Sequence, residues 1–210
     1  MKPEGKRLPA SWYRSHDVTQ MARDLLGKFL CTEIDGHYCS GIIVETEAYR
    51  GPDDRAAHSF NNRRTARTEV MFWKGGVSYI YVCYGMHHLM NVVTATKDVA
   101  HAVLIRALEP ADGVEVMAQR RNMSLTDNRI TKGPGALSVA MGLHKMYSGL
   151  PLYRKDSPLW IEDRGVKFSQ DEICISKRIG VESAGDAAHW PWRFFVKGNK
   201  YVSASRRCSQ

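Results

Sequence analysis

The sequence of 210 residues lacks a long hydrophobic run. A bilayer span needs roughly 20 apolar residues, whereas the longest candidate, residues 77–86, is short and contains tyrosine hydroxyls. The basic N-terminus also lacks the apolar stretch of a secretory signal peptide. These absences exclude a membrane-spanning protein and predict an intracellular one, cytoplasmic and nucleoid-associated in a bacterium or nuclear in a eukaryote.

Cysteine is sparse and irregularly placed. The five cysteines, an odd number, form no CxxC pair, and no histidine is spaced for a closed zinc site. We therefore expect no metal site. Free, mostly buried thiols in a reducing compartment explain this pattern better than a disulfide framework does.

The sequence has neither an internal repeat nor a low-complexity linker, so nothing indicates a second domain. Hydrophobic residues make up 43% of the chain, enough to bury a core, and 30 Lys plus Arg against 22 Asp plus Glu give a net charge of +8. We expect one domain over residues 15–204, with a loose basic arm at 1–14 and a tail at 205–210. The surface of this domain should be basic.

Local patterns predict the helices and strands. Apolar residues at helical spacing predict a helix over 17–26, with Asp17 and Gln20 as a capping pair and Gly27 as its stop. Asp35 and Gly36 predict a tight hairpin turn between strands at 28–34 and 37–49. Further strands are expected at 78–84, 87–95, 101–110, 159–163, 172–178 and 193–198, and further helices at 111–121 and 133–142.

The strand at 37–49 ends in the densest group of chemically suggestive residues. Glu45 and Glu47 would share one face of this strand, and a long polar segment that carries His58 follows at 50–67. Strand ends that feed loops commonly present catalytic groups. From spacing alone, the simpler interpretation is that one glutamate is solvated and the other pairs with an arginine such as Arg106.

Aromatic and basic residues gather in two further segments. Tyr79 and Tyr81 share one strand face, while Tyr84 points elsewhere, toward the turn at Gly85. An exposed aromatic or apolar side chain beside cations is what insertion between DNA base steps requires. Tyrosines in such a strand are also common in protein cores, and charge runs are usually solvated. The phosphate contacts would come from three arginines of the polar segment, Arg63, Arg64 and Arg67.

Several long motifs, in the right order, closely resemble the alkyladenine (3-methyladenine, methylpurine) DNA glycosylase family. The matching stretches are VETEAYRGPDDRAAHS, RTEVMF, YIYVCYGMHHLMNVV, AVLIRALEP and KGPGALSVAMGL. The resemblance covers about residues 26–202 and implies a single mixed α+β domain with a curved antiparallel β-sheet flanked by short helices. It also implies a monofunctional enzyme of DNA base-excision repair. Such an enzyme flips alkylated or deaminated purines out of the duplex and hydrolyses the N-glycosidic bond, leaving an abasic site.

The resemblance assigns catalytic and base-binding roles residue by residue. Glu47 would be the general base that activates a water, and Arg106 would help to hold that water. The backbone carbonyl of Ile179 would complete the water site. Asn91 would crowd the exocyclic amino group of normal guanine. The flipped base would stack between Tyr49 on one side and two residues on the other, His58 and Tyr81.

DNA contacts would follow from the same resemblance. Tyr84 would fill the space that the flipped base leaves, with Met86 and His87 beside it. His87 and the segment 74–76 depart from the more usual family residues. The backbone contacts are expected from the basic residues Arg63, Arg64, Arg67 and Lys132.

The implied chemistry needs no cofactor. A glutamate-activated water replaces the base, and no lysine lies in the motifs assigned to catalysis, so a Schiff base and strand cleavage are not expected. The expected partner is damaged double-stranded DNA, and the protein is expected to be a monomer whose product passes to downstream abasic-site enzymes. The competing hypotheses are a nucleic-acid binding module without catalysis and an RNA-modifying enzyme or nucleoside hydrolase.

Overall fold

The computed structural model describes residues 5–203 and residue 208. No helix within these residues is long and apolar enough to cross a membrane. The α-helices are α1 (Val18–Asp24), α2 (Val114–Arg121) and α3 (Pro134–Met141). The strands are β1 (Lys6–Arg7), β2 (Phe29–Ile34), β3 (His37–Arg50), β4 (Ser78–Cys83), β5 (His87–Thr94), β6 (His101–Asp112), β7 (Leu159–Asp163), β8 (Ile173–Ser176) and β9 (Arg193–Val196). Short 3-10 helices lie at Ala10–Tyr13, Phe60–Asn62, Glu69–Phe72, Lys145–Tyr147, Gln170–Glu172 and Glu182–His189.

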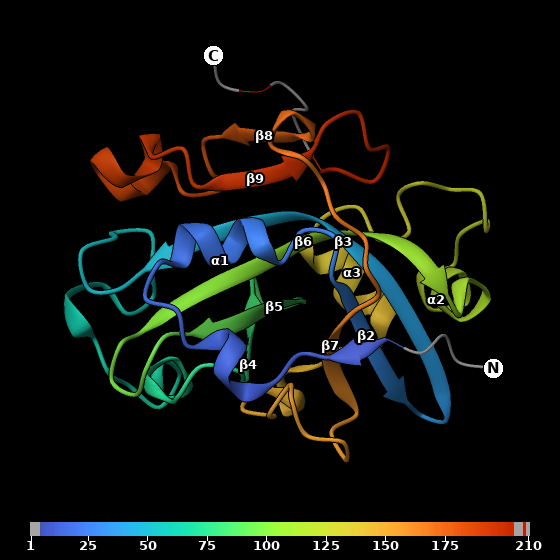
Figure 1. Cartoon of the computed structure of the whole chain (residues 1–210), viewed down its shortest axis with the longest axis horizontal. Coiled ribbons are helices and arrows are strands. Elements are labelled where there is room, and N and C mark those ends of the chain that lie inside the picture. The colour runs from blue at the N-terminus through green and yellow to red at the C-terminus, as the bar shows by residue number, and fades with distance from the viewer. Residues whose placement is uncertain (1–4, 204–207, 209–210) are drawn as a thin grey trace.

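The described residues form one nine-stranded antiparallel sheet around two long strands, β3 and β6, which cross the molecule in Figure 1. The strand order is β1-β7-β2-β3-β6-β5-β4, and the β8–β9 hairpin joins through β9, which pairs with β3. One edge of β3 therefore has two partners. Its first half pairs with β2, and residues 45–47 pair with β9.

The β3–β6 ladder is irregular where the partner of β3 changes. Ile43 pairs with Leu108 and Glu45 with Ala107, so Val44 is an extra residue on β3; Thr46 then pairs with Ile105, which leaves Arg106 as an extra residue on β6. Such bulges re-aim side chains and are common beside active sites. The two irregularities place Glu45 and Arg106 next to each other.

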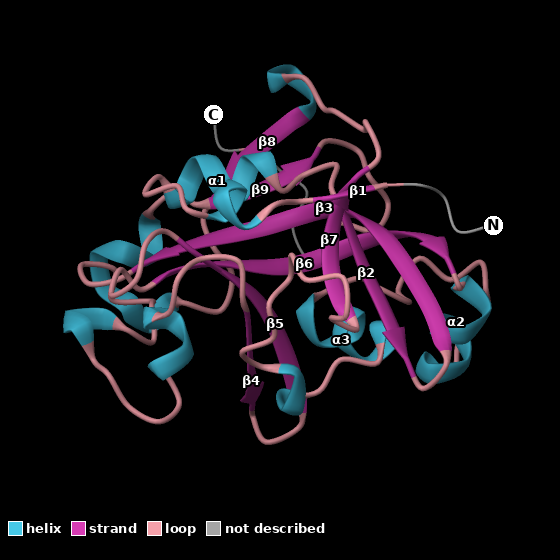
Figure 2. Cartoon of the chain, turned by 60° about the horizontal axis from the view of Figure 1, so that its bottom comes forward, coloured by secondary structure: helices cyan, strands magenta, loops and turns pink. Residues whose placement is uncertain are grey.

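Helices cover the sheet, and the main core lies between them and the strands (Figure 2). Buried Met21 and Leu25 from the α1 segment belong to the same cluster as Leu137 and Met141 of α3 and as residues of β2, β3, β5, β6 and β7. The sheet thus has a firmly packed centre. The fold is the mixed α+β domain expected from the sequence.

The local predictions agree with the structure. The Asp17 side chain accepts from the Gln20 backbone N–H at 2.9 Å and caps α1. Asp35 and Gly36 have positive φ angles of 55° and 75°, as the hairpin between β2 and β3 requires. The other predicted strands and helices are present, with ends shifted by a few residues.

The N-terminal segment differs from the expected loose arm. Lys6 and Arg7 pair with Glu162 and Asp163 of β7, and Tyr13 is completely buried in the main core. The sequence of this segment gave no sign of the pairing, because Arg7 and its partner Glu162 are 155 positions apart. Residues 1–4 of the arm, and 205–207 and 209–210 of the tail, lie outside the described residues.

The expectation that all cysteines are free is wrong for one pair. Cys174 of β8 and Cys208 form a disulfide, with Cα atoms 5.0 Å apart. Cys31 and Cys39 are free and buried, and Cys83 is free and half-buried. Over the described residues, no group of three or more His, Cys, Asp or Glu side chains could hold a metal ion.

The packing of Tyr13 predicts the stability of the N-terminal segment. Replacing Tyr13 with Ala would leave a large cavity and should lower the free energy of unfolding by about 3–5 kcal/mol. Urea denaturation would measure this. The exposed neighbour Ser11 is the control, since Ser11→Ala should change stability by less than about 0.5 kcal/mol. Equal stability of the two variants would mean that the segment is a loose arm after all.

Candidate active site

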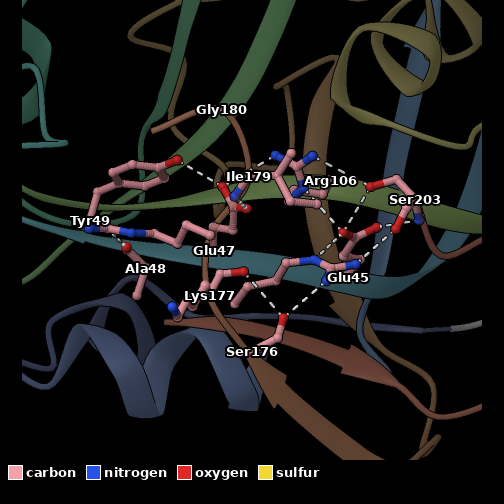
Figure 3. A network of polar contacts seen from close by, with 12 residues as sticks. Glu45, Glu47, Ala48, Tyr49, Arg106, Ser176, Lys177, Ile179, Gly180 and Ser203 are labelled. Carbon is pink, nitrogen blue, oxygen red and sulfur yellow. Dashed lines mark hydrogen bonds and ion pairs between the residues drawn. The ribbon is translucent and has the colours of Figure 1, made fainter. Parts of the chain in front are cut away.

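Glu47 is a completely buried carboxylate held by three donors. Its Oε2 accepts from the Tyr49 hydroxyl at 2.8 Å and from Arg106 Nη1 at 3.2 Å, and its Oε1 accepts from the Ile179 backbone N–H at 2.8 Å. Figure 3 shows these groups converging from different parts of the chain. The Ile179 contact is made by its amide, whereas the sequence hypothesis invoked its carbonyl.

The arrangement leaves Glu47 able to accept a further hydrogen bond. A carboxylate offers about four lone-pair directions, and the described residues fill two on Oε2 and one on Oε1. A carboxylate with one unfilled direction can orient a water and take its proton.

Glu45 is also completely buried, and it accepts four hydrogen bonds. Its Oε1 accepts from Arg106 Nε at 3.1 Å, from Arg193 Nε at 2.7 Å and from the Ser203 hydroxyl at 2.8 Å. Its Oε2 accepts from the Ser203 backbone N–H at 2.6 Å. Neither glutamate is solvated, so the simpler interpretation of the sequence is wrong. Glu45 holds Arg106 in place beside Glu47 (Figure 3).

A pocket of about 470 Å³ lies next to Glu47 and is lined by its three donors, Tyr49, Arg106 and Ile179. Most other predicted base-binding residues line it as well. Asn91 is buried at its wall and donates its side-chain amide to the Tyr79 carbonyl at 3.1 Å. Its aromatic lining comes from Tyr49, His58, Tyr79, Tyr81 and Tyr84.

His58 is neutral in this pocket. Burial, and then the positive charge of Arg67, lower the pKa of His58 from 6.5 to about 4. Arg67 Nη2 lies 3.2 Å from His58 Nε2, and because arginine only donates, this nitrogen is an acceptor. The proton is therefore on Nδ1, which lies 2.9 Å from the Tyr79 hydroxyl. The His58 ring meets Tyr81 edge to face, with centroids 4.5 Å apart.

Tyr84 stands at the tip of the β4–β5 hairpin with 89% of its surface exposed. Its φ is +50°, in the left-handed region that large side chains avoid. Met86 is 68% exposed beside it, and His87 packs against Gly135 of α3, where an added Cβ would lie 3.1 Å from the imidazole ring. An exposed aromatic on a strained turn costs stability, which favours a functional explanation.

The comparisons with known proteins agree with this geometry. A family model described as "Methylpurine-DNA glycosylase (MPG)" matches residues 11–200. The chain belongs to the methylpurine-DNA glycosylase family. Its relatives include proteins provisionally named 3-methyladenine DNA glycosylase from Bacillus cereus (strain G9842) and Bacillus subtilis (strain 168). Each is 45% identical, over 93% and 97% of this chain and 98% and 100% of the relative, respectively. A protein of the same name from Alkaliphilus oremlandii is 44% identical over 88% of this chain and 93% of its own.

Family membership confirms the resemblance drawn from the motifs, the fold class and the enzyme class, a DNA glycosylase. The substrate of this family is DNA. The individual roles of the pocket and hairpin residues stay predictions, although the structure gathers Glu47, Tyr49, His58, Tyr81, Asn91, Arg106 and Ile179 at one pocket.

The predicted phosphate contacts are not equivalent in the structure. Arg64 is engaged by Glu69 and Asp98, at 2.7 and 2.9 Å. Arg67 lies at the base pocket, and Lys132 Nζ donates to the Lys200 carbonyl at 3.4 Å. Arg63 is exposed and lines a neighbouring hollow of about 330 Å³. Of these residues, Arg63 fits the phosphate role best.

Sequence reasoning missed a buried ion pair behind the Tyr49 wall. Arg178 and Asp54, both with fully buried side chains, form a bidentate pair with one contact at 2.8 Å. The Arg178 guanidinium also lies 4.8 Å from the Tyr49 ring centroid and donates to the Ala48 carbonyl. This pair ties the loop after β3 to the segment that carries Ile179. Asp54 lies inside the motif GPDDRAAHS, but nothing in the sequence identified its partner.

The Glu45 network generates a prediction about stability. Glu45→Gln removes the negative charge between Arg106 and Arg193, and breaking such a buried pair should cost about 3–5 kcal/mol. Urea denaturation of this variant should be compared with that of Glu115→Gln, an exposed glutamate in the first turn of α2, which should lose no more than about 1 kcal/mol. Similar losses in both variants would contradict a structural role for Glu45.

The depressed pKa of His58 predicts how stability depends on pH. Between pH about 4 and 6.5 the unfolded chain binds a proton on His58 that the folded chain does not bind, so stability should fall as the pH drops through this range. Unfolding free energies at pH 7 and pH 4.5 should show a loss up to about 3 kcal/mol larger for the wild type than for His58→Gln. His101, whose pKa is also lowered, is present in both proteins and cancels. The same loss in both proteins would contradict a lowered pKa of His58 in the folded protein.

Proposed function

We propose that this protein is a 3-methyladenine DNA glycosylase of base-excision repair that excises alkylated and deaminated purines from duplex DNA. The observation that carries the proposal is the Glu47 carboxylate, buried and held by Tyr49, Arg106 and Ile179 beside an aromatic pocket of about 470 Å³. The names of its relatives support the same activity. The range of substrates would cover 3-methyladenine, 7-methylguanine, hypoxanthine and ethenoadenine.

The base is inaccessible in a stacked duplex, so the nucleotide must be extruded, at a cost of a few kcal/mol. Tyr49 on one side and His58 with Tyr81 on the other would stack on the flipped base and offset that cost by roughly 1–3 kcal/mol. Tyr84, exposed on the hairpin tip, would occupy the gap and prevent the base from returning. Met86, His87 and Arg63 would contact the DNA around it.

The glycosidic bond would then break through an oxocarbenium-like state, as in other glycoside hydrolyses. The Glu47 carboxylate stabilises the positive charge on the sugar and takes the proton of the attacking water. Arg106 orients the carboxylate and the water, and Asn91 excludes normal guanine by crowding its exocyclic amino group. The product is an abasic site for downstream repair enzymes. A monomeric state and an intracellular location remain predictions.

Glu47→Gln tests the proposal directly. The amide keeps the shape of the side chain but cannot take the water's proton, so single-turnover release of 3-methyladenine from duplex DNA should fall by at least about 10²-fold. Binding to the lesion should persist. Glu115→Gln, remote from the pocket, should act at the wild-type rate, and thermal denaturation checks that both variants fold.

The same assay separates the competing functions. A wild-type protein that binds methylated duplex DNA but releases no base would be a binding module. Cleavage of free nucleosides in preference to duplex DNA would indicate a nucleoside hydrolase. Near wild-type release by Glu47→Gln would remove Glu47 from the mechanism.

A further inference from the structure

Arg67 belongs to the basic run of the polar segment, but its side chain is directed at the base pocket. Its Nη2 lies 3.2 Å from His58 Nε2, and its Cζ lies 5.1 Å from the centroid of the Tyr81 ring. Both of these rings line the pocket, and so does Arg67 itself. The residue is exposed at the mouth, where bound DNA would cover it. A guanidinium in contact with the two rings of one wall would lie at the edge of a base stacked on them.

The charge of Arg67 is not neutralised in the way that neighbouring arginines are. Arg106 pairs with Glu45 and Glu47, and Arg178 pairs with Asp54. Across residues 5–203 and 208, no carboxylate lies within ion-pair distance of Arg67. Its contacts are instead the neutral imidazole of His58, the ring of Tyr81 and the hydroxyl of Tyr79. Arg67 therefore adds a positive charge to the mouth of the pocket. DNA that covers Arg67 would exclude water and so strengthen the electrostatic interaction between this charge and a bound base.

Alkylated and deaminated purines differ in how they respond to a nearby cation. A purine alkylated at N7 is itself positively charged, has no free N7 lone pair and leaves readily. Hypoxanthine is neutral and offers N7 and O6 as acceptors on one edge, the pair that arginine recognises in a bidentate way on guanine. Its departure places negative charge on the ring, which donors held in position can stabilise.

We propose that Arg67 is a specificity-determining residue that promotes excision of neutral deaminated purines by donating to their N7 and O6 edge. This inference rests on the proposed function and deepens it. As the C1′–N9 bond breaks, its electron pair moves to N9 and spreads toward N7 and O6, where the guanidinium stabilises it. Water adds to C1′ and its proton goes to Glu47, and the released purine anion takes a proton from solvent. For 7-methylguanine the same guanidinium repels the base and finds no acceptor at N7.

The test compares two duplexes that differ only in the lesion, hypoxanthine or 7-methylguanine, under single-turnover conditions with saturating enzyme. Arg67→Met keeps an unbranched side chain beside Tyr81 but removes the donors, so release of hypoxanthine should fall by about 10²-fold. Release of 7-methylguanine should be unchanged or faster. Arg67→Lys keeps the charge without the planar fork and should give an intermediate ratio of the two rates.

Arg63→Met is the matched control, because Arg63 is exposed on the same segment and fits a phosphate contact. It should weaken DNA binding equally for both lesions and leave the ratio of release rates unchanged. Thermal denaturation of all variants checks folding, and the Lys variant serves if Arg67→Met is unstable. An equal loss for both lesions in Arg67→Met, with a shallower salt dependence of DNA binding, would make Arg67 a phosphate contact and overturn the inference.

The outcomes also separate this inference from the function on which it rests. A wild-type enzyme that releases 7-methylguanine but not hypoxanthine would overturn the role of Arg67 and leave the glycosylase function standing. A wild-type enzyme that releases neither of these bases, and no 3-methyladenine either, would overturn both.

Discussion

Two glutamates without any exposure to solvent sit two residues apart on one strand, and the site is built around the need to compensate their charge. An unpaired buried carboxylate would cost several kcal/mol. Arg193 and Ser203 both donate hydrogen bonds to Glu45. Arg106 contacts both carboxylates and is shared between them. Glu45 thus keeps the local charge balanced, and Glu47 retains an acceptor direction for chemistry.

The irregular pairing of β3 and β6 brings the two glutamates and their arginine partners together. An unbroken β3–β6 ladder would alternate side chains strictly between the two faces. The extra residues Val44 and Arg106 interrupt that alternation where β9 replaces β2 as the partner of β3. The change of partner brings Arg193 opposite Glu47, and its guanidinium reaches Glu45. The irregularity of the sheet therefore determines how Glu45, Glu47 and their arginine partners are positioned.

The sequence predicted those features that depend on residues close together in the chain. Asp17 as a cap and the Asp35–Gly36 turn follow from backbone preferences, and the long motifs identified the family and most of the pocket. The rest depends on partners far away in the chain. The burial of Glu45 requires Arg193 and Ser203, and the strand at Lys6–Arg7 requires β7, so neither has a local signal. Arg64 and Arg67 look alike in sequence, yet one is held by carboxylates and the other by the pocket.

The remoteness of these partners has a consequence for synthesis of the protein. Ile179 reaches Glu47 across 132 positions, and Ser203 reaches Glu45 across 158. A chain emerging from the ribosome therefore carries Glu47 long before Ile179 and Glu45 long before Ser203, and closing such long loops comes late in folding. Glu47 gains its contact with Ile179, and Glu45 gains Arg193 and Ser203, only when residues 179–203 have docked. The site proposed for catalysis is therefore completed only after most of the sheet that carries Glu47 and Arg106 has been synthesised.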